Sequence, residues 1–271
     1  MDKKTKRKYL IGVFDSGFGG LQILKHIVKE LPQYDYVYLG DTARIPYGSR
    51  SQEIILSFVN QAVNFLFKKD CQLVIFACNT ASAKALCKIQ KKYPNKKVLG
   101  VIIPAVEEAI DDNHNSIGII ATQGSVSSGA FVREAKKINP KIKIFQQACP
   151  LLVPIVETGE EKSEIADIML KKYLKPLLKN KIDALVLGCT HYGFLENKIK
   201  KIVGKEIKVI SEGKIVARKL KKYLLAHLEV EEILSLNSKR DFFTTDLTDG
   251  FKALGSKFFG AKIIPKKVKI D

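Results

Sequence analysis

Short apolar runs rich in β-branched residues alternate with longer amphipathic stretches along nearly the whole chain. The runs predict strands at 8–14, 35–40, 72–77, 97–103, 116–121, 141–146, 183–188 and 207–210. The amphipathic stretches predict helices at 21–31, 51–69, 80–93, 163–179 and 213–228. Alternation at this spacing is typical of βαβ units. It therefore predicts an α/β fold with mostly parallel sheets.

A weak internal repeat indicates two similar halves. LIGVFDSGFGG at 10–20 resembles SIGIIATQGSVSSG at 116–129, and QLVIFACNTAS at 72–82 resembles ALVLGCTHYG at 184–193. The offset is 106 residues between Gly12 and Gly118, and 111 residues between Cys78 and Cys189. A nearly constant offset predicts two pseudo-symmetric α/β domains with the active site in the cleft between them.

The predicted domain boundaries follow from this repeat. The first domain covers residues 1–103, and the second covers 104–211. Residues 212–271 are too few for a third domain, so we expect this C-terminal segment to pack back on the first.

The net charge of +18 admits a different class of function, a basic nucleic-acid-associated binding protein. Most of the surplus is lysine, dispersed along polar helix faces and at both chain ends, as in KKTKRK at 3–8 and PKKVKI at 265–270. The sequence shows no nucleic-acid-binding motif, which disfavours specific nucleic-acid binding.

The apolar stretch after the basic N-terminus is too short for a signal peptide, so we expect a cytoplasmic protein with no membrane association.

The five cysteines are odd in number and scattered, without Cys-x-x-Cys or zinc-ligand spacing. We expect free thiols in a reducing compartment. Cys71, Cys87 and Cys149 are interpreted as packing residues.

Cys78 and Cys189 differ from the other cysteines because each follows an apolar strand directly. Ligands of open α/β sheets bind at the carboxyl ends of strands. The segment 79–82 also has the polar caps of a helix start, whose free amides attract anions. We expect these amides to lower the pKa of the Cys78 thiol, which makes Cys78 a candidate base or nucleophile.

Two thiols facing one cleft admit three kinds of chemistry. A redox disulfide is disfavoured by the lack of a vicinal pair, and a metal site would have only Cys78, Cys189 and His191 as ligands. Two opposed bases would remove a proton from one face of a carbon and return one to the other, which inverts its configuration. Asp15 could then reach Cys78, and His191 could assist Cys189.

Gly17, Gly19 and Gly20 follow the first predicted strand. The segment DSGFGGLQI lacks the third glycine of a dinucleotide-binding loop. We expect these glycines to let the backbone approach a small ligand.

Five stretches together carry a resemblance to a known family. They are VFDSGFGG (13–20), YLGDTARIPYGSRS (38–51), FACNTASA (76–83), CPLLVPIVETG (149–159) and LGCTHYG (187–193). In order and spacing they resemble the glutamate racemase family of the aspartate/glutamate racemase superfamily, over most of the chain up to about residue 220. The resemblance implies an isomerase without cofactor or metal, a homodimer, and production of D-glutamate for peptidoglycan synthesis in a bacterial cell.

The resemblance also implies roles for individual residues. Cys78 and Cys189 match the two catalytic acid/base thiols, with Cys78 acting on D-glutamate, while Asp15, His191 and Glu157 match auxiliary catalytic residues. The implied substrate contacts are Asp15, Ser16, Pro46, Tyr47, Gly48, Asn79, Thr80, Thr190 and His191. A racemase for aspartate or another amino acid is the alternative, because the sequence does not reveal the distance between the substrate's carboxylates.

The sequence departs from the family pattern at three positions. Ile103 stands where glutamate is common, Gly193 where proline is common, and Ser211 where aspartate is usual. None of these positions matches a catalytic residue.

Overall fold

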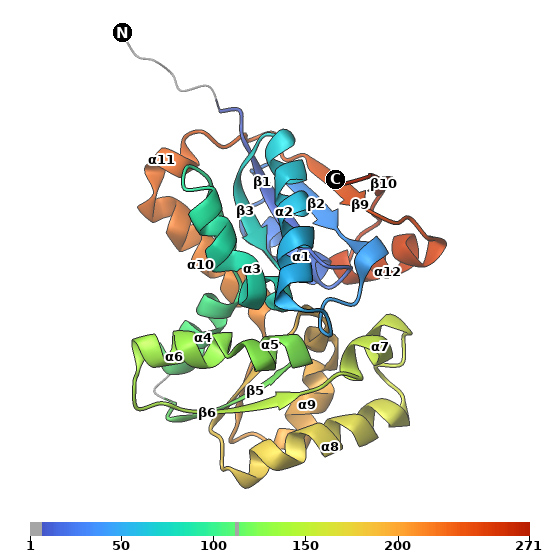
Figure 1. The fold of residues 1–271 in the computed structure, drawn as a ribbon. Helices are drawn as coiled ribbons and strands as arrows, with labels where there is room; N and C mark the ends of the chain where they lie inside the picture. The colour runs from blue at the N-terminus through green and yellow to red at the C-terminus, as the bar shows by residue number, and fades with distance from the viewer. Residues whose placement is uncertain (1–6, 112–113) are drawn as a thin grey trace.

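A computed structural model describes residues 7–111 and 114–271, and most of the basic N-terminal stretch lies outside these residues (Figure 1). The chain forms a six-stranded sheet in the order β10-β9-β2-β1-β3-β4 and a four-stranded sheet in the order β6-β5-β7-β8. The pairings between neighbouring strands of both sheets are parallel. The predicted α/β class is therefore confirmed.

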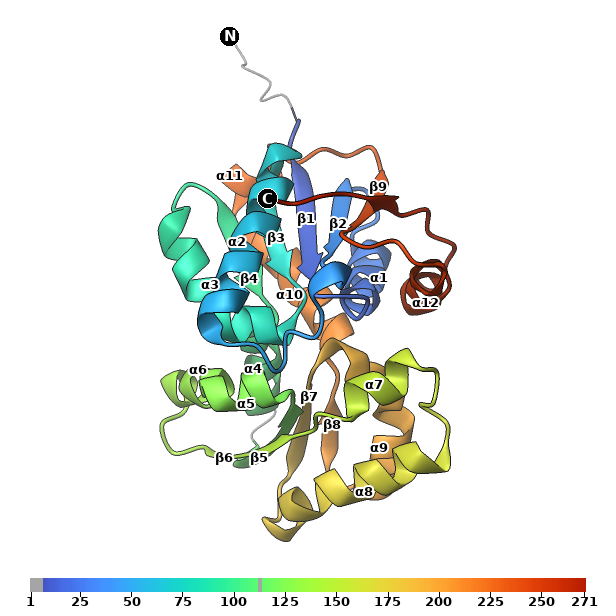
Figure 2. The same cartoon turned by 45° about the vertical axis from the view of Figure 1, so that its right-hand side comes forward.

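The first sheet contains β1 (Leu10–Asp15), β2 (Tyr36–Gly40), β3 (Cys71–Phe76), β4 (Lys97–Gly100), β9 (Arg240–Thr244) and β10 (Lys266–Lys267). The second contains β5 (Ser116–Ala121), β6 (Lys143–Ala148), β7 (Ala184–Gly188) and β8 (Lys208–Ile210). Figure 2 shows the two sheets in separate halves of the molecule, with β1 and the C-terminal β9 in the same half. The domain boundaries themselves stay a prediction.

The helices cover both faces of each sheet. They are α1 (Gly20–Glu30), α2 (Gln52–Lys68), α3 (Asn79–Lys92), α4 (Ile102–Asp111), α5 (Gln123–Ser128), α6 (Ala130–Ile138), α7 (Leu152–Glu157), α8 (Glu164–Lys179), α9 (Glu196–Val203), α10 (Glu212–Ala226), α11 (Leu228–Glu231) and α12 (Asp249–Phe259). Two 3₁₀ helices, η1 (Thr42–Arg44) and η2 (Thr190–Leu195), follow strand ends.

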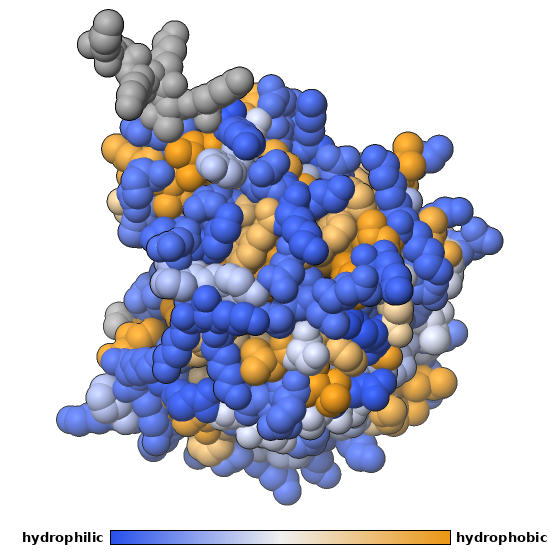
Figure 3. Space-filling model, turned by 45° about the horizontal axis from the view of Figure 1, so that its top comes forward, coloured by the Kyte–Doolittle hydropathy of each residue, from blue (hydrophilic) through white to orange (hydrophobic). Residues whose placement is uncertain are grey.

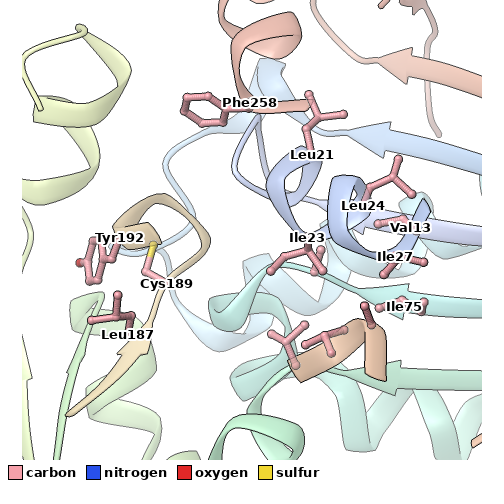
Figure 4. Close-up of a cluster of buried hydrophobic side chains, with 14 of the residues drawn as sticks. Val13, Leu21, Ile23, Leu24, Ile27, Ile75, Leu187, Cys189, Tyr192 and Phe258 are labelled. Carbon is pink, nitrogen blue, oxygen red and sulfur yellow. The ribbon is translucent and has the colours of Figure 1, made fainter. Parts of the chain in front are cut away.

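Alternate side chains of the central strands enter different cores, as parallel strands covered on both faces require. In β1, Val13 packs with α1, α10 and α12, whereas Phe14 packs with α2 and α3. In β7, Leu187 joins α7, α8 and α9, whereas Val186 joins α4 and α6. The first of these cores is continuous between the halves, so Leu187 and Cys189 belong to the same cluster as Val13 (Figure 4).

The strand predicted at 97–103 is too long. β4 ends at Gly100 and α4 begins at Ile102, so Ile102 and Ile103 are helical. Pro104 lies in the first turn of α4, where a proline has no intrahelical amide bond to lose. An apolar run alone does not distinguish the end of a buried strand from the start of a buried helix.

The two sheets share one strand order. Both β2-β1-β3-β4 and β6-β5-β7-β8 place the first strand of the unit beside the second and third, as the internal repeat predicts. The connections after the first and second strands therefore leave in opposite directions. Such a reversal opens a crevice at the carboxyl ends of the two central strands, where ligands bind in open α/β sheets.

The surface is rich in hydrophilic side chains, with apolar patches between them, on the face shown in Figure 3. In the described part of the chain, no helix is both long and apolar enough to cross a membrane.

Candidate active site

A cavity of about 430 Å³ lies where the carboxyl ends of the two sheets meet. Its lining includes nearly every residue that the sequence analysis assigned to the site: Ser16, Pro46, Tyr47, Gly48, Cys78, Asn79, Thr80, Glu157, Cys189, Thr190 and His191. Asp15 is buried at the end of β1 and is absent from this lining. The two halves of the chain thus contribute to one cavity.

Cys78 follows β3 and is the N-cap of α3, where its sulfur accepts a hydrogen bond from the Ala81 amide at 3.5 Å. Helices α2, α5 and α8 have a serine or threonine in this position. The Ser16 hydroxyl lies 3.3 Å from the Cys78 sulfur.

The expected lowering of the Cys78 pKa is wrong. Burial raises the pKa of this thiol to about 11, and the nearby charge of Asp15 raises it further. Hydrogen bonds from Ser16 and Ala81 act in the opposite direction but do not compensate for desolvation. The resting thiol is therefore protonated at neutral pH.

Cys189 follows β7 and leads into the 3₁₀ helix η2. Burial raises the pKa of this thiol well above its ordinary value, while a hydrogen bond from the His191 backbone lowers it. The Cys189 sulfur lies 3.8 Å from His191 Nδ1. An imidazole nitrogen thus lies within hydrogen-bonding reach of this sulfur.

His191 is held from both sides. Its Nε2 lies 3.0 Å from Glu157 Oε1 at the end of α7, and its ring forms a T-shaped contact with the Phe258 ring of α12 at a centroid distance of 5.7 Å. With Nε2 bonded to the carboxylate, Nδ1 is oriented toward the sulfur of Cys189. A cysteine, a histidine and a glutamate thus form a chain suited to proton transfer.

Asp15 acts on Cys78 through its charge, while Ser16 supplies the hydrogen bond to the sulfur. Asp15 Oδ1 accepts a hydrogen bond from the Gly17 amide at 2.8 Å, and the buried Oδ2 has no hydrogen-bond partner in the described part of the chain. Burial raises the pKa of Asp15, and the charge of His191 opposes that rise. A buried carboxylate with one free oxygen can accept a proton or bind a cationic group.

The glycines after β1 serve close packing of the chain against itself. A Cβ atom on Gly19 would lie 2.0 Å from Thr190 Oγ1, and one on Gly20 would lie 2.5 Å from the Asp15 Cβ. The expectation that Gly19 and Gly20 make room for a ligand is therefore wrong. The missing side chain of Gly19 lets the loop after β1 reach the loop after β7, whereas that of Gly20 lets α1 begin directly against Asp15 and Ala77.

The loop at 46–48 closes the cavity from the first half. The Tyr47 hydroxyl donates to Asp41 Oδ2 at 2.5 Å, and the Gly48 carbonyl accepts from the Gly124 amide at 2.8 Å. The Tyr47 hydroxyl therefore uses its hydrogen on a bond within the protein. The Gly48–Gly124 bond joins this loop to α5 of the other half.

The structure brings further residues to the site that the sequence analysis did not assign to it, among them Thr122, Cys149 and Glu212. Thr122 lines the cavity, and its hydroxyl lies 2.8 Å from that of Thr80. A signal for it was present, because the repeat offset of 106 residues aligns Thr122 with Ser16. Cys149, interpreted as a packing residue, also lines the cavity, and Glu212 lies behind Asn79.

Cys71 is buried as expected for a packing residue, whereas Cys87 is exposed, so its interpretation as a packing residue is wrong.

Within residues 7–111 and 114–271, no group of three or more His, Cys, Asp or Glu side chains is placed to hold a metal ion.

Known proteins resemble this chain over nearly its full length. Residues 11–220 match the family described as Asp/Glu/Hydantoin racemase. The glutamate racemase of Geobacter metallireducens is 39% identical over 254 residues, 93% of each protein. The crystal structure of the Francisella tularensis glutamate racemase in complex with D-glutamate has a TM-score of 0.90 and 34% identity, with 97% of this chain and 98% of that chain covered.

A Bacillus anthracis glutamate racemase structure also has a TM-score of 0.90, at 35% identity, with 97% of this chain and 98% of that chain covered. The chain therefore belongs to the Asp/Glu/hydantoin racemase family. Within that family it groups with the glutamate racemases, and it is an enzyme of the isomerase class. The resemblance seen in the five sequence motifs is thereby confirmed.

Proposed function

We propose that the enzyme interconverts L-glutamate and D-glutamate without a cofactor, using Cys78 and Cys189 as two opposed acid/base groups. The main observation in support is that these thiols follow equivalent strands of two pseudo-symmetric halves and line one cavity. The names of the similar proteins from Geobacter metallireducens and Francisella tularensis support glutamate as the substrate.

In each turnover one sulfur is a thiolate and the other is a thiol. The thiolate takes the Cα proton, and the opposite thiol gives its proton to the other face of the same carbon. Inversion therefore leaves the enzyme with the two protonation states exchanged and needs no other reactant. Cys78 acts on D-glutamate and Cys189 on L-glutamate.

Burial equips the thiols for this step. The α-proton of an amino acid is weakly acidic, and a sulfur whose pKa is raised to about 11, as for Cys78, is a strong base once it is ionised. His191, held by Glu157, exchanges the proton of Cys189. Asp15 and Ser16 assist the proton exchange of Cys78 in the same way.

Two carboxylates on the substrate need several donors, and the cavity lining supplies them. Ser16, Thr80 and Thr190 carry hydroxyl groups that can donate to these carboxylates. The loop at 46–48 adds backbone donors. A cavity of about 430 Å³ is large enough for an amino acid of this size.

The cellular role belongs to the same proposal. D-glutamate made by the enzyme supplies peptidoglycan synthesis, and with it the cell wall and cell shape of a bacterium. The enzyme acts in the cytoplasm as a homodimer.

The test is incubation of L-glutamate, D-glutamate and both enantiomers of aspartate with the enzyme in D₂O without added cofactor. We expect glutamate to lose optical rotation from either direction while α-deuterium appears in the product. Failure of both glutamate enantiomers to react contradicts the proposal. Reaction of aspartate in their place assigns the enzyme to the alternative substrate.

A further inference from the structure

Glu212 is a buried carboxyl group that the two-thiol scheme leaves without a role. It is the first residue of α10, directly after the second sheet, and only 3% of it is exposed. Its Oε1 accepts a hydrogen bond from Asn79 Nδ2 at 2.5 Å, across 133 residues of chain. Its Oε2 is buried and has no hydrogen-bond partner among the residues that the structure describes.

Asn79 lies between this carboxyl group and the cavity. It lines the cavity and is the residue after Cys78, while Glu212 is absent from the lining. Because Asn79 Nδ2 is bonded to Glu212, the Oδ1 atom is left as the free end of the amide, buried and without a partner within residues 7–111 and 114–271. Buried polar atoms are nearly always satisfied, so this oxygen indicates a donor that arrives with a ligand.

An α-amino acid offers one strong donor group at neutral pH, its ammonium, since both glutamate carboxylates are acceptors. We propose that Glu212 is a positioning residue that fixes the Asn79 amide with Oδ1 free to accept a hydrogen bond from the substrate's ammonium group. The inference rests on the proposed function for its substrate. It assigns Glu212 an action through Asn79, with no direct contact to the substrate.

The electrostatic setting fits this role. Burial raises the pKa of Glu212 to about 8, so at neutral pH the carboxyl group is mostly protonated. Ionised Glu212 would raise the pKa of the Cys189 thiol. His26 of α1 packs beside Gly213, and burial lowers its pKa. A neutral acceptor at position 212 therefore orients Asn79 without placing a charge next to the reacting groups.

The test compares two substitutions of similar length. Glu212→Met keeps the volume and removes the acceptor, and Glu212→Gln keeps a carbonyl oxygen for Asn79 Nδ2. We expect E212M to raise the KM for both glutamate enantiomers about tenfold, with kcat within about twofold, because a buried donor loses its partner. We expect E212Q to keep a KM close to that of the wild type.

Glutarate tests whether the effect depends on the ammonium group, because it has both carboxylates and no amine. We expect its inhibition constant to be equal in the wild type and E212M. The exposed Glu206 provides a control, since E206Q removes a carboxylate away from the cavity. Melting temperatures show that each variant is folded.

Three results would overturn the inference: an unchanged KM in E212M, a KM in E212Q as high as in E212M, or a parallel loss of glutarate binding. Calorimetric binding of D-glutamate is measured beside turnover. Wild-type enzyme that binds D-glutamate but does not racemise it contradicts the proposed function alone, and the variants are then compared by dissociation constant. Wild-type enzyme that does neither overturns both.

Discussion

The two halves of the molecule place a cysteine after equivalent strands but surround it differently. Cys78 caps a full helix and has a hydroxyl and the charge of a carboxylate as neighbours. Cys189 leads into a 3₁₀ helix and has the His191–Glu157 pair. Duplication of the fold therefore supplies two equivalent positions for a thiol, while the side chains around each position differ.

The largest expected effect tests what the halves share. Cys78→Ala and Cys189→Ala each remove one of two bases, so racemisation should fall by about a thousandfold or more in both variants. The measurement is the rate of loss of optical rotation from each enantiomer. Cys87→Ala is the matched control, because Cys87 is exposed and outside the cavity. Substantial activity in either of the first two variants contradicts the two-base scheme.

The next effect tests how the halves differ. His191→Ala removes the imidazole 3.8 Å from the Cys189 sulfur, so proton abstraction by Cys189 should slow about a hundredfold. The substrate isotope effect with α-deuterated glutamate should then become larger for L-glutamate than for D-glutamate. An equal change of the isotope effect for L-glutamate and D-glutamate would show that His191 serves the two thiols alike.

A third prediction concerns Glu212, which joins α10 to the Asn79 side chain of the first half. Its pKa is raised from 4.5 to about 8, so the folded state holds a proton that the unfolded chain releases. The resulting stabilisation is complete below pH 4.5 and is lost as the pH rises through 8. We expect a loss of roughly 5 kcal/mol in the wild type over this pH range, absent in E212Q, measured by urea unfolding at a series of pH values. Parallel pH profiles for the two proteins contradict this linkage.

The smallest effect isolates the carboxylate that holds the histidine. Glu157→Gln keeps a hydrogen-bond partner 3.0 Å from His191 Nε2 but removes its charge. We expect kcat to fall about tenfold, with KM nearly unchanged, since charge-assisted hydrogen bonds are stronger than neutral ones. In the double variant with His191→Ala, the Glu157 substitution should have no further effect. An additional loss there would assign Glu157 a role independent of His191.

Much of the fold was predictable because its signals are local. The strand and helix periodicities gave the α/β class, and the offset between Cys78 and Cys189 gave two equivalent strand ends. The prediction failed at Ile102, where an apolar run changes from strand to helix without a change in composition. The alignment of Thr122 with Ser16 was present in the repeat, but alignment alone does not show which strand-end residues reach the cavity.

The sequence by itself determined the alternating elements, the duplicated pattern and the motifs that place the chain among the racemases, because each depends on residues close together in the chain. Only the tertiary structure decided the electrostatics. The pKa of Cys78 is raised, contrary to the expectation from its helix start, because desolvation depends on distant segments packed around the thiol. The Asn79–Glu212 bond spans 133 residues, and a contact of that kind exists only once the two halves have packed together.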